Sequence, residues 1–196
     1  MGKLILIRHG QTDMNKEGIY YGRLDVPINE VGKQQAEETR KRLMEHKIDY
    51  DKIYASTMLR ACQTADIVNY KNLPVENSSL IREMDFGIFE GMTYEELKEK
   101  YPKELQQSAE DWKNYSYETG ENPYMLQKRA VEFLNQIDKS VNTLVVTHWG
   151  IICSLMSWLF SKELDGYWKF KIKNGGIAVI EFDGDFPVLL GFNIGG

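Results

Sequence analysis

Two of the three histidines in the sequence directly follow apolar runs that are typical of buried strands. His9 ends the run KLILIRH, and His148 ends the run NTLVVTH. Ligands of open α/β sheets bind beyond the carboxyl ends of the strands, so we expect both imidazoles at a binding or catalytic site. His46 instead lies in the charged stretch RLMEHKIDYD and is expected on a solvated surface.

The neighbours of His9 are suited to binding a tetrahedral oxyanion such as phosphate. Arg8 carries a rigid fork of N–H donors, and Gly10 allows the backbone to approach a ligand closely. Thr12 and Asn15 add uncharged donors, and a helix or turn that begins there would direct free N–H groups at an anion. Taken alone, His9 could also be a structural imidazole that is hydrogen-bonded at the end of a strand.

A metal site is the competing interpretation of two convergent histidines. The sequence contains no HExxH motif, no CxxC motif and no carboxylate at ligand spacing beside either histidine, so we expect no metal ion. The phosphate-binding patterns GxxxxGK[ST] and GxGxxG are also missing from the sequence. Nucleoside triphosphate and dinucleotide chemistry are therefore disfavoured, and we expect no cofactor.

Five sequence blocks occur in the order found in the histidine phosphatase superfamily, and the chain resembles that family over most of its length. The blocks are RHGQT (8–12), YYGRLDVPINEVGKQQA (20–36), ASTMLRACQTA (55–65), REMDFGIFEG (82–91) and VTHWG (146–150). The resemblance implies that His9 is a nucleophile that becomes a phosphohistidine, and that Glu83 is the proton donor. Asp85 is the next candidate if Glu83 is only a surface acid.

The resemblance also implies which residues bind the substrate. The implied clamp on the transferring phosphoryl group consists of Arg8, Arg60 and His148. Asn15 matches a phosphate-contacting position, and Tyr21 with Gly22 falls in a substrate-contacting loop. Phosphoryl transfer requires in-line geometry and fixed positive charge around the phosphoryl oxygens, which two arginines and a second imidazole can supply.

Two residues depart from the usual family pattern. Trp149 follows His148 where many relatives have a small residue, so the indole either narrows the substrate pocket or packs outward. Tyr21 occupies a position that is often small or amidic. Neither residue belongs to the implied phosphate clamp.

The resemblance leaves the reaction open, because phosphoglycerate mutases and phosphatases share the same centre. A mutase needs cations beyond the phosphate clamp, and this chain does not match the arginine pair and longer insert of the familiar mutases. The stretch DFGIFEGMTYEEL (85–97) resembles the small phosphatases, in particular those that act on α-ribazole 5′-phosphate in cobalamin assembly. We therefore expect a phosphomonoester hydrolase for a small phosphorylated metabolite, with α-ribazole 5′-phosphate as the first candidate. The alternatives are a broad-specificity phosphatase, a phosphoglycerate mutase and a non-catalytic phosphate-binding module.

The polar segment 101–122 is predicted to form a lid-like excursion. Pro102 and Gly120 interrupt it, and its charged side chains are mostly acidic. The aromatic residues in and just beyond it are Trp112, Tyr115, Tyr117 and Tyr124. Aromatic side chains over a site favour a flat or apolar leaving group, but ordinary packing of the lid is the favoured explanation for them.

Short β-rich runs alternate with longer helical patterns along the chain, which predicts an α/β fold with a largely parallel sheet. The expected strands cover 3–9, 50–56, 142–148, 177–183 and 187–193, the last two pairing as a hairpin across 183–185. The expected helices cover 30–47 after an Asn29 cap, 57–70, 93–100, 124–139 and 150–161. The family resemblance adds a three-layer α/β/α sandwich of the phosphoglycerate mutase type, with one antiparallel strand near the C-terminus.

Composition limits the classes of protein and partner. With 42% hydrophobic residues, the chain can form one well-buried domain over 1–196. Its net charge of −5 argues against a nucleic-acid or anionic-membrane partner. No apolar run reaches the length of a membrane span, and the N-terminal run is too short for a signal peptide. We therefore expect a cytoplasmic protein, and the apolar C-terminal segment PVLLGFNIGG leaves a homodimer open.

Overall fold

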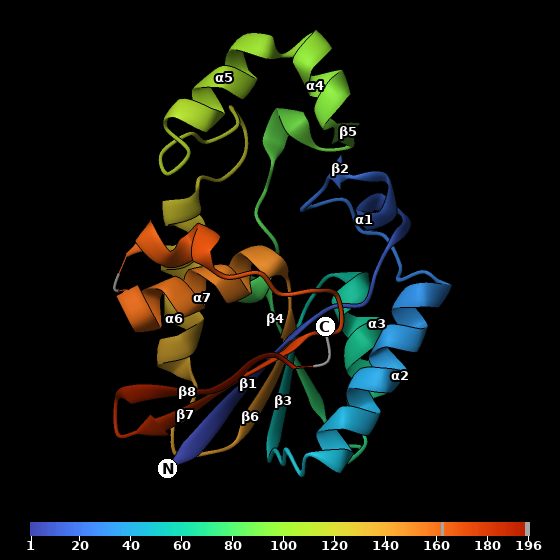
Figure 1. Ribbon diagram of the computed structural model, residues 1–196, viewed down its shortest axis with the longest axis vertical. Coiled ribbons are helices and arrows are strands. Elements are labelled where there is room, and N and C mark those ends of the chain that lie inside the picture. The colour runs from blue at the N-terminus through green and yellow to red at the C-terminus, as the bar shows by residue number, and fades with distance from the viewer. Residues whose placement is uncertain (162, 195–196) are drawn as a thin grey trace.

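A mixed six-stranded sheet forms the centre of the computed structural model, which describes residues 1–161 and 163–194 (Figure 1). In spatial order the strands are β4 (Val75–Ser78), β3 (Lys52–Ser56), β6 (Thr143–Thr147), β1 (Gly2–Arg8), β7 (Ile177–Asp183) and β8 (Phe186–Ile194). The first four strands are parallel to one another, and β7 pairs antiparallel with both of its neighbours. Strand β8 therefore runs in the direction of β1. The expectation of one antiparallel strand near the C-terminus is confirmed.

Helices cover both faces of this sheet, which confirms the three-layer α/β/α arrangement. Helices α2 (Glu30–Glu45) and α3 (Leu59–Val68) lie on one face, and α6 (Pro123–Gln136) and α7 (Trp149–Ser161) lie on the other (Figure 1). Each begins and ends close to its predicted range. Asn29 caps α2 as predicted, because its side chain accepts a hydrogen bond from the Gly32 amide at 2.9 Å.

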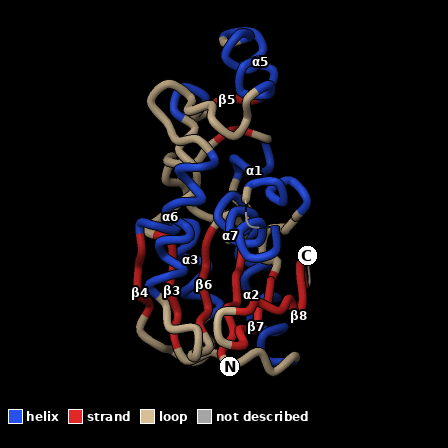
Figure 2. The backbone as a smooth tube through the Cα atoms, turned by 90° about the vertical axis from the view of Figure 1, so that its left-hand side faces the viewer, coloured by secondary structure: helices blue, strands red, loops and turns tan. Residues whose placement is uncertain are grey.

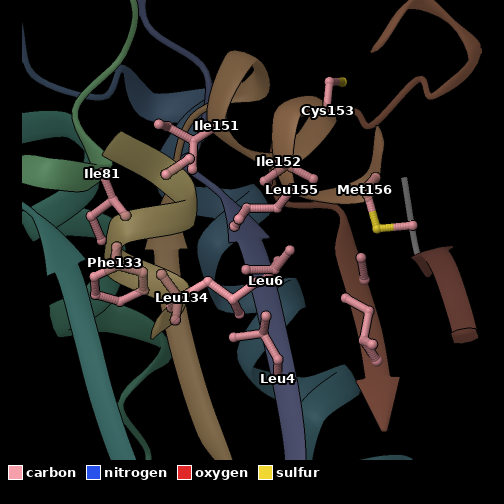
Figure 3. Close-up of a cluster of buried hydrophobic side chains, with 14 of the residues drawn as sticks. Leu4, Leu6, Ile81, Phe133, Leu134, Ile151, Ile152, Cys153, Leu155 and Met156 are labelled. Atoms are coloured by element: carbon pink, nitrogen blue, oxygen red, sulfur yellow. The ribbon is translucent and has the colours of Figure 1, made fainter. Parts of the chain in front are cut away.

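The buried core follows from the alternation of side chains along β1. Leu4 and Leu6 point to the cluster under α6 and α7, which Figure 3 shows, whereas Ile5 and Ile7 belong to the cluster under α2 and α3. A parallel strand with helices on both faces has no solvated side. This explains why the sequence of β1 is an uninterrupted apolar run rather than an alternating one.

A smaller set of elements lies beyond the carboxyl ends of the parallel strands. It consists of α1 (Asp13–Glu17), the two-stranded sheet of β2 (Ile19–Tyr20) and β5 (Met92–Thr93), α4 (Tyr94–Lys100) and α5 (Pro102–Glu110). Short 3₁₀ helices cover Ser79–Ile81, Gly87–Phe89 and Leu164–Lys169. Figures 1 and 2 place α5 at the end of the molecule opposite the N-terminus.

Several elements were not expected from the sequence, among them α5, β4 and the short strands β2 and β5. Helix α5 begins at Pro102, where the sequence predicts an interruption. Proline is favourable in the first turn of a helix, where its missing N–H has no partner to lose. Strand β4 has the sequence VENS and lies at the edge of the sheet. Its mostly polar side chains give no apolar pattern from which a strand could be predicted. Among the described residues, no helix has the length and apolar character needed to cross a membrane.

Truncation of a β1 core side chain tests the two-sided burial of this strand. Leu6 is fully buried, so Leu6→Ala should lower the free energy of unfolding by about 2–5 kcal/mol. Val31→Ala, which truncates an exposed side chain on α2, is the matched control and should change it by less than about 0.5 kcal/mol. Urea unfolding followed by circular dichroism measures both values. Equal effects of the two substitutions would contradict the buried position of Leu6.

Candidate active site

The pairing of β1 with β6 brings the two strand-end histidines together. The two strands are parallel neighbours with Arg8 opposite Thr147, so His9 and His148 leave the sheet side by side. Their ring centroids lie 5.1 Å apart and the rings meet edge to face at 60°. Residues far apart in the sequence therefore form one site at the carboxyl edge of the sheet.

Hydrogen bonding and burial set the protonation state of His9. Its Nδ1 lies 2.7 Å from the carbonyl oxygen of Gly10. A carbonyl only accepts, so Nδ1 carries the hydrogen and Nε2 keeps its lone pair. Burial, followed by the nearby charges of Arg60 and Arg8, lowers the pKa of His9 well below its ordinary value of 6.5. His9 is thus a neutral imidazole with an available nucleophilic nitrogen.

His148 is also neutral, with the opposite tautomer. Its Nδ1 accepts a hydrogen bond from Arg60 Nε at 3.3 Å, and its Nε2 donates to Ser56 Oγ at 2.8 Å. Burial, and then the charge of Arg60, lower the pKa of His148 well below 6.5. The fully buried ring contacts Arg60 directly, so it fixes the position of that guanidinium.

Arg60 lies in the first turn of α3 and is fully buried. Its Nη1 donates to the Leu24 carbonyl at 2.9 Å, its Nη2 donates to the Gly22 carbonyl at 2.8 Å, and the guanidinium lies 4.6 Å from the centre of the Tyr21 ring. Burial lowers the pKa of this arginine, although a guanidinium stays charged in proteins. No carboxylate is among these hydrogen-bond partners, so the positive charge remains available to an anion.

Arg8 supplies a second cation, which is partly buried. Its Nη1 donates to the Ile172 carbonyl at 2.8 Å, whereas its buried Nε has no hydrogen-bond partner among the residues that the structure describes. Burial lowers the pKa of Arg8 as well. A buried donor without a partner is rare in folded proteins, and Arg8 is one of the residues that line a cavity.

That cavity, which we call the polar cavity, has a volume of about 530 Å³. The residues that line it are Arg8, His9, Met14, Asn15, Gly18, Ile19, Tyr20, Tyr21, Arg60, Glu83, Phe86, Tyr94 and Trp149. It contains both arginines, the neutral His9 and a single carboxylate among its lining residues. This composition favours the binding of a dianion such as a phosphomonoester.

Asn15 reaches the polar cavity from the start of α1. Its Oδ1 accepts from the Thr12 amide at 3.2 Å, which completes a capping box, and from Asn174 Nδ2 at 3.2 Å. The oxygen end of the amide is thus occupied, and the NH₂ end is left for a ligand. Thr12 itself does not line the cavity; its hydroxyl bonds that of Tyr21 at 2.7 Å.

Glu83 lies outside α7 in the sequence, and its carboxylate contacts the first turn of that helix. Its Oε2 accepts from the Gly150 amide at 3.2 Å and its Oε1 accepts from the Met84 amide at 2.9 Å. A Cβ at position 150 would lie 2.4 Å from Oε1, so only glycine leaves room for the carboxylate. The alternative acid, Asp85, bonds the Gly87 amide and pairs with Arg23 outside the polar cavity. Of these two acids, only Glu83 lines the polar cavity.

Gly10 and Gly22 do not line the polar cavity, and both are required by close packing of the backbone. A Cβ on Gly10 would lie 2.4 Å from the Gly32 carbonyl oxygen at the start of α2. A Cβ on Gly22 would lie 1.5 Å from the Met84 carbonyl oxygen. Glycine at position 10 thus allows close approach to α2, and glycine at position 22 allows close approach to the Met84 carbonyl.

A second cavity of about 750 Å³, the aromatic cavity, adjoins the polar one. The residues that line both are Tyr20, Phe86, Tyr94 and Trp149. Trp149 packs against Tyr167 and Trp168, with ring centroids 5.2 Å and 5.3 Å apart, and lines both cavities. Of the aromatic residues in segment 101–122, Trp112 and Tyr117 line the aromatic cavity.

Several residues of the site were missed by the sequence analysis. Ser56, which bonds His148, lies inside a recognised block but has no distinguishing signal of its own. Asn174 donates to the His9 carbonyl at 2.9 Å and lies in a glycine-containing loop outside the five blocks. Arg129, which contacts the backbone of Glu83, lies on α6, for which the sequence predicts only a helix. Contacts between distant segments bring these residues to the site, and the local sequence pattern does not encode them.

The chain matches a known protein family over nearly its whole length. The family model for the histidine phosphatase superfamily (branch 1) matches residues 4–195. The chain is 32% identical to phosphoserine phosphatase 1 of Hydrogenobacter thermophilus, over 99% of this chain and 93% of that protein. It is 28% identical to the adenosylcobalamin/α-ribazole phosphatase of Escherichia coli, over 95% of this chain and 93% of that protein. A crystal structure of the α-ribazole phosphatase from Shigella flexneri superposes with a TM-score of 0.90 at 27% identity, covering 97% of this chain and 96% of that one.

The depressed pKa values of the two histidines predict a pH-dependent stability. An unfolded histidine binds a proton near pH 6.5, whereas both imidazoles stay neutral in the folded protein, so stability falls as the pH drops below 6.5. His148→Gln should reduce the slope of the free energy of unfolding against pH, by about 1 kcal/mol per pH unit between about pH 6.5 and 5. Urea unfolding at a series of pH values measures the slope. His46→Gln, at an exposed position, is the control; a slope unchanged by His148→Gln would contradict the neutral ring.

Proposed function

The chain belongs to the histidine phosphatase superfamily (branch 1), and from this premise we propose that it hydrolyses phosphomonoesters through a phosphohistidine intermediate on His9. One observation carries the proposal. A neutral His9 lies beside Arg8 and Arg60 in a cavity whose single lining carboxylate is Glu83. Nucleophile, phosphate clamp and proton donor are the three parts that this chemistry requires.

In the first step, the Nε2 lone pair of His9 attacks phosphorus and the ester P–O bond breaks. Arg8 and Arg60 hold the phosphoryl oxygens and offset their charge, and Glu83 donates a proton to the departing alkoxide. The Gly10 carbonyl accepts the Nδ1 hydrogen of His9, so it stabilises the positive charge that the ring acquires on phosphorylation. The product alcohol leaves, and Glu83 remains as a carboxylate.

In the second step, the Glu83 carboxylate takes a proton from water while the water oxygen attacks phosphorus. The P–N bond breaks, its electron pair returns to Nε2 of His9, and inorganic phosphate is released. Both residues are then restored to their starting states. The backbone amides of Met84 and Gly150 hold the carboxylate at the same position in both steps.

The aromatic cavity supports α-ribazole 5′-phosphate as the preferred substrate. This molecule carries one phosphate and a flat fused aromatic base, and none of the residues that line the aromatic cavity has a charged side chain. Phosphoserine and 3-phosphoglycerate would bring further charged groups, and their partners are missing from the lining of both cavities apart from the phosphate clamp and Glu83. The same feature argues against mutase activity. Phosphoserine hydrolysis is the second candidate, because the relative at 32% identity bears that name.

Replacement of the nucleophile tests the reaction. His9→Ala should lower kcat for p-nitrophenyl phosphate by about 10³-fold or more, because no other group in the polar cavity can form the covalent intermediate. Acid-quench trapping with labelled substrate should give an acid-labile, alkali-stable phosphoryl group on His9 of the wild type. His46→Ala is the control and should keep full activity. Label on a serine or aspartate would refute the assignment.

Removal of the shared aromatic wall tests the substrate. Trp149→Ala should raise KM for α-ribazole 5′-phosphate by about 10-fold, since the indole is available to stack on the base, and leave KM for ribose 5-phosphate within about 2-fold. Trp158→Ala, an exposed tryptophan on the same helix, is the matched control. Steady-state kinetics also rank α-ribazole 5′-phosphate above phosphoserine if the proposal holds. A preference for phosphoserine would refute the substrate and leave the phosphatase assignment intact.

A further inference from the structure

Glu83 lies on a stretch of backbone that has no regular secondary structure. Residues 82–86 connect two 3₁₀ helices and belong to neither a helix nor a strand. Backbone hydrogen bonds of a regular element therefore do not fix the position of the proton donor. Catalytic groups must be held to within a fraction of an ångström, so some other part of the molecule has to immobilise this segment.

Arg129, on α6, binds the backbone of this segment with its guanidinium. Its Nη1 donates to the carbonyl oxygens of Leu80, at 2.8 Å, and of Arg82. Its Nη2 donates to the carbonyl oxygen of Glu83 itself at 2.9 Å. A single side chain thus binds three carbonyls within four consecutive residues, which is the kind of recognition that the planar fork of an arginine allows.

Glu121 holds Arg129 in this position through a two-pronged ion pair. Arg129 Nε donates to Glu121 Oε1 and Nη2 donates to Oε2, both at 2.8 Å, so all five N–H hydrogens of the guanidinium are used. Burial raises the pKa of Glu121, but the hydrogen bond and charge of Arg129 outweigh it, and the pKa is lowered overall. Both side chains are largely buried, at 13% and 14% exposure. Loss of either partner would therefore leave a buried charge without compensation.

The same pair also reaches the far side of Glu83. Glu121 Oε2 accepts from the Asp85 amide at 3.1 Å, and the Glu121 amide donates to the Asp85 carbonyl at 2.9 Å. Arg23, next to Gly22, approaches Glu121 at 3.3 Å and Asp85 at 3.4 Å. The backbone is thus anchored on both sides of Glu83, while Arg129 itself lines neither the polar nor the aromatic cavity.

We propose that Arg129, held by Glu121, is a positioning residue for the proton donor Glu83, and this inference rests on the proposed function. Arg129 touches no substrate and acts by fixing the backbone on which Glu83 is carried. Without it, the carboxylate would lose its placement against the Gly150 amide at the start of α7. The loss should affect protonation of the leaving group far more than the attack by His9, because separate contacts hold His9: its amide donates to the Thr147 carbonyl of β6, and its ring donates to the Gly10 carbonyl.

The test compares leaving groups that do and do not need a proton. 2,4-Dinitrophenyl phosphate releases a stable anion without an acid, whereas ribose 5-phosphate releases an alkoxide that must be protonated. Arg129→Met should lower kcat for ribose 5-phosphate by about 10- to 100-fold and for 2,4-dinitrophenyl phosphate by less than about 3-fold. Glu83→Gln gives the reference pattern for loss of the acid. Arg129→Lys should restore part of the ribose 5-phosphate activity, because lysine keeps the charge opposite Glu121 but lacks the fork.

Two further variants keep the test decisive. Glu121→Gln removes the charge that holds Arg129, so it should show the same dependence on the leaving group and replaces Arg129→Met if that variant does not fold. Arg42→Met removes a partly exposed arginine that pairs with Glu38 on α2, far from both cavities in the fold, and should leave both substrates unaffected. Equal losses on the two substrates, or no loss, would overturn the positioning role while the phosphatase assignment stands. A wild-type protein inactive on both substrates would overturn the proposed function and the positioning role together.

Discussion

The hydrogen-bonded pairing of β1 with β6 is the interaction on which the rest of the site depends. It places the ends of two parallel strands side by side, and so sets the 5.1 Å separation of the His9 and His148 rings. The burial that makes both strands stable also removes water from the imidazoles. The same packing that forms the core therefore keeps His9 neutral and able to act as a nucleophile in the proposed reaction.

Buried positive charge is the feature that this scaffold accommodates next to the histidines. Arg8 and Arg60 are held by backbone carbonyls rather than by carboxylates, so their charge is positioned but not cancelled. Two protonated histidines beside them would repel one another and both guanidinium groups, and the depressed pKa values avoid this arrangement. A bound phosphate offsets the uncancelled positive charge of the two guanidinium groups, which explains why such a site favours a dianion.

In the proposed reaction the two cavities hold different parts of the substrate: the polar cavity binds the phosphate, and the aromatic cavity binds the leaving group. The polar cavity is built from the sheet edge, α1 and the Glu83 segment, whereas the aromatic cavity uses α5, η3 (Leu164–Lys169) and the loop before α6. Relatives named for phosphoserine and for α-ribazole both match nearly the whole chain. Binding of the phosphate requires only the arginines of the polar cavity. We therefore expect differences in substrate preference between relatives to arise from the residues that line the aromatic cavity.

The sequence by itself determined the buried strands, the helices with clear caps and the histidines at strand ends, because each depends on a local pattern or a short recognised block. Continuous apolar runs revealed β1 and β6, and the order of the blocks indicated the family. Only the tertiary structure decided that Glu83 rather than Asp85 faces the polar cavity, that Gly10 packs on α2, and that Arg129 holds the Glu83 segment. These outcomes depend on contacts between segments many residues apart, whose energies arise from packing and buried hydrogen bonds that no local periodicity records.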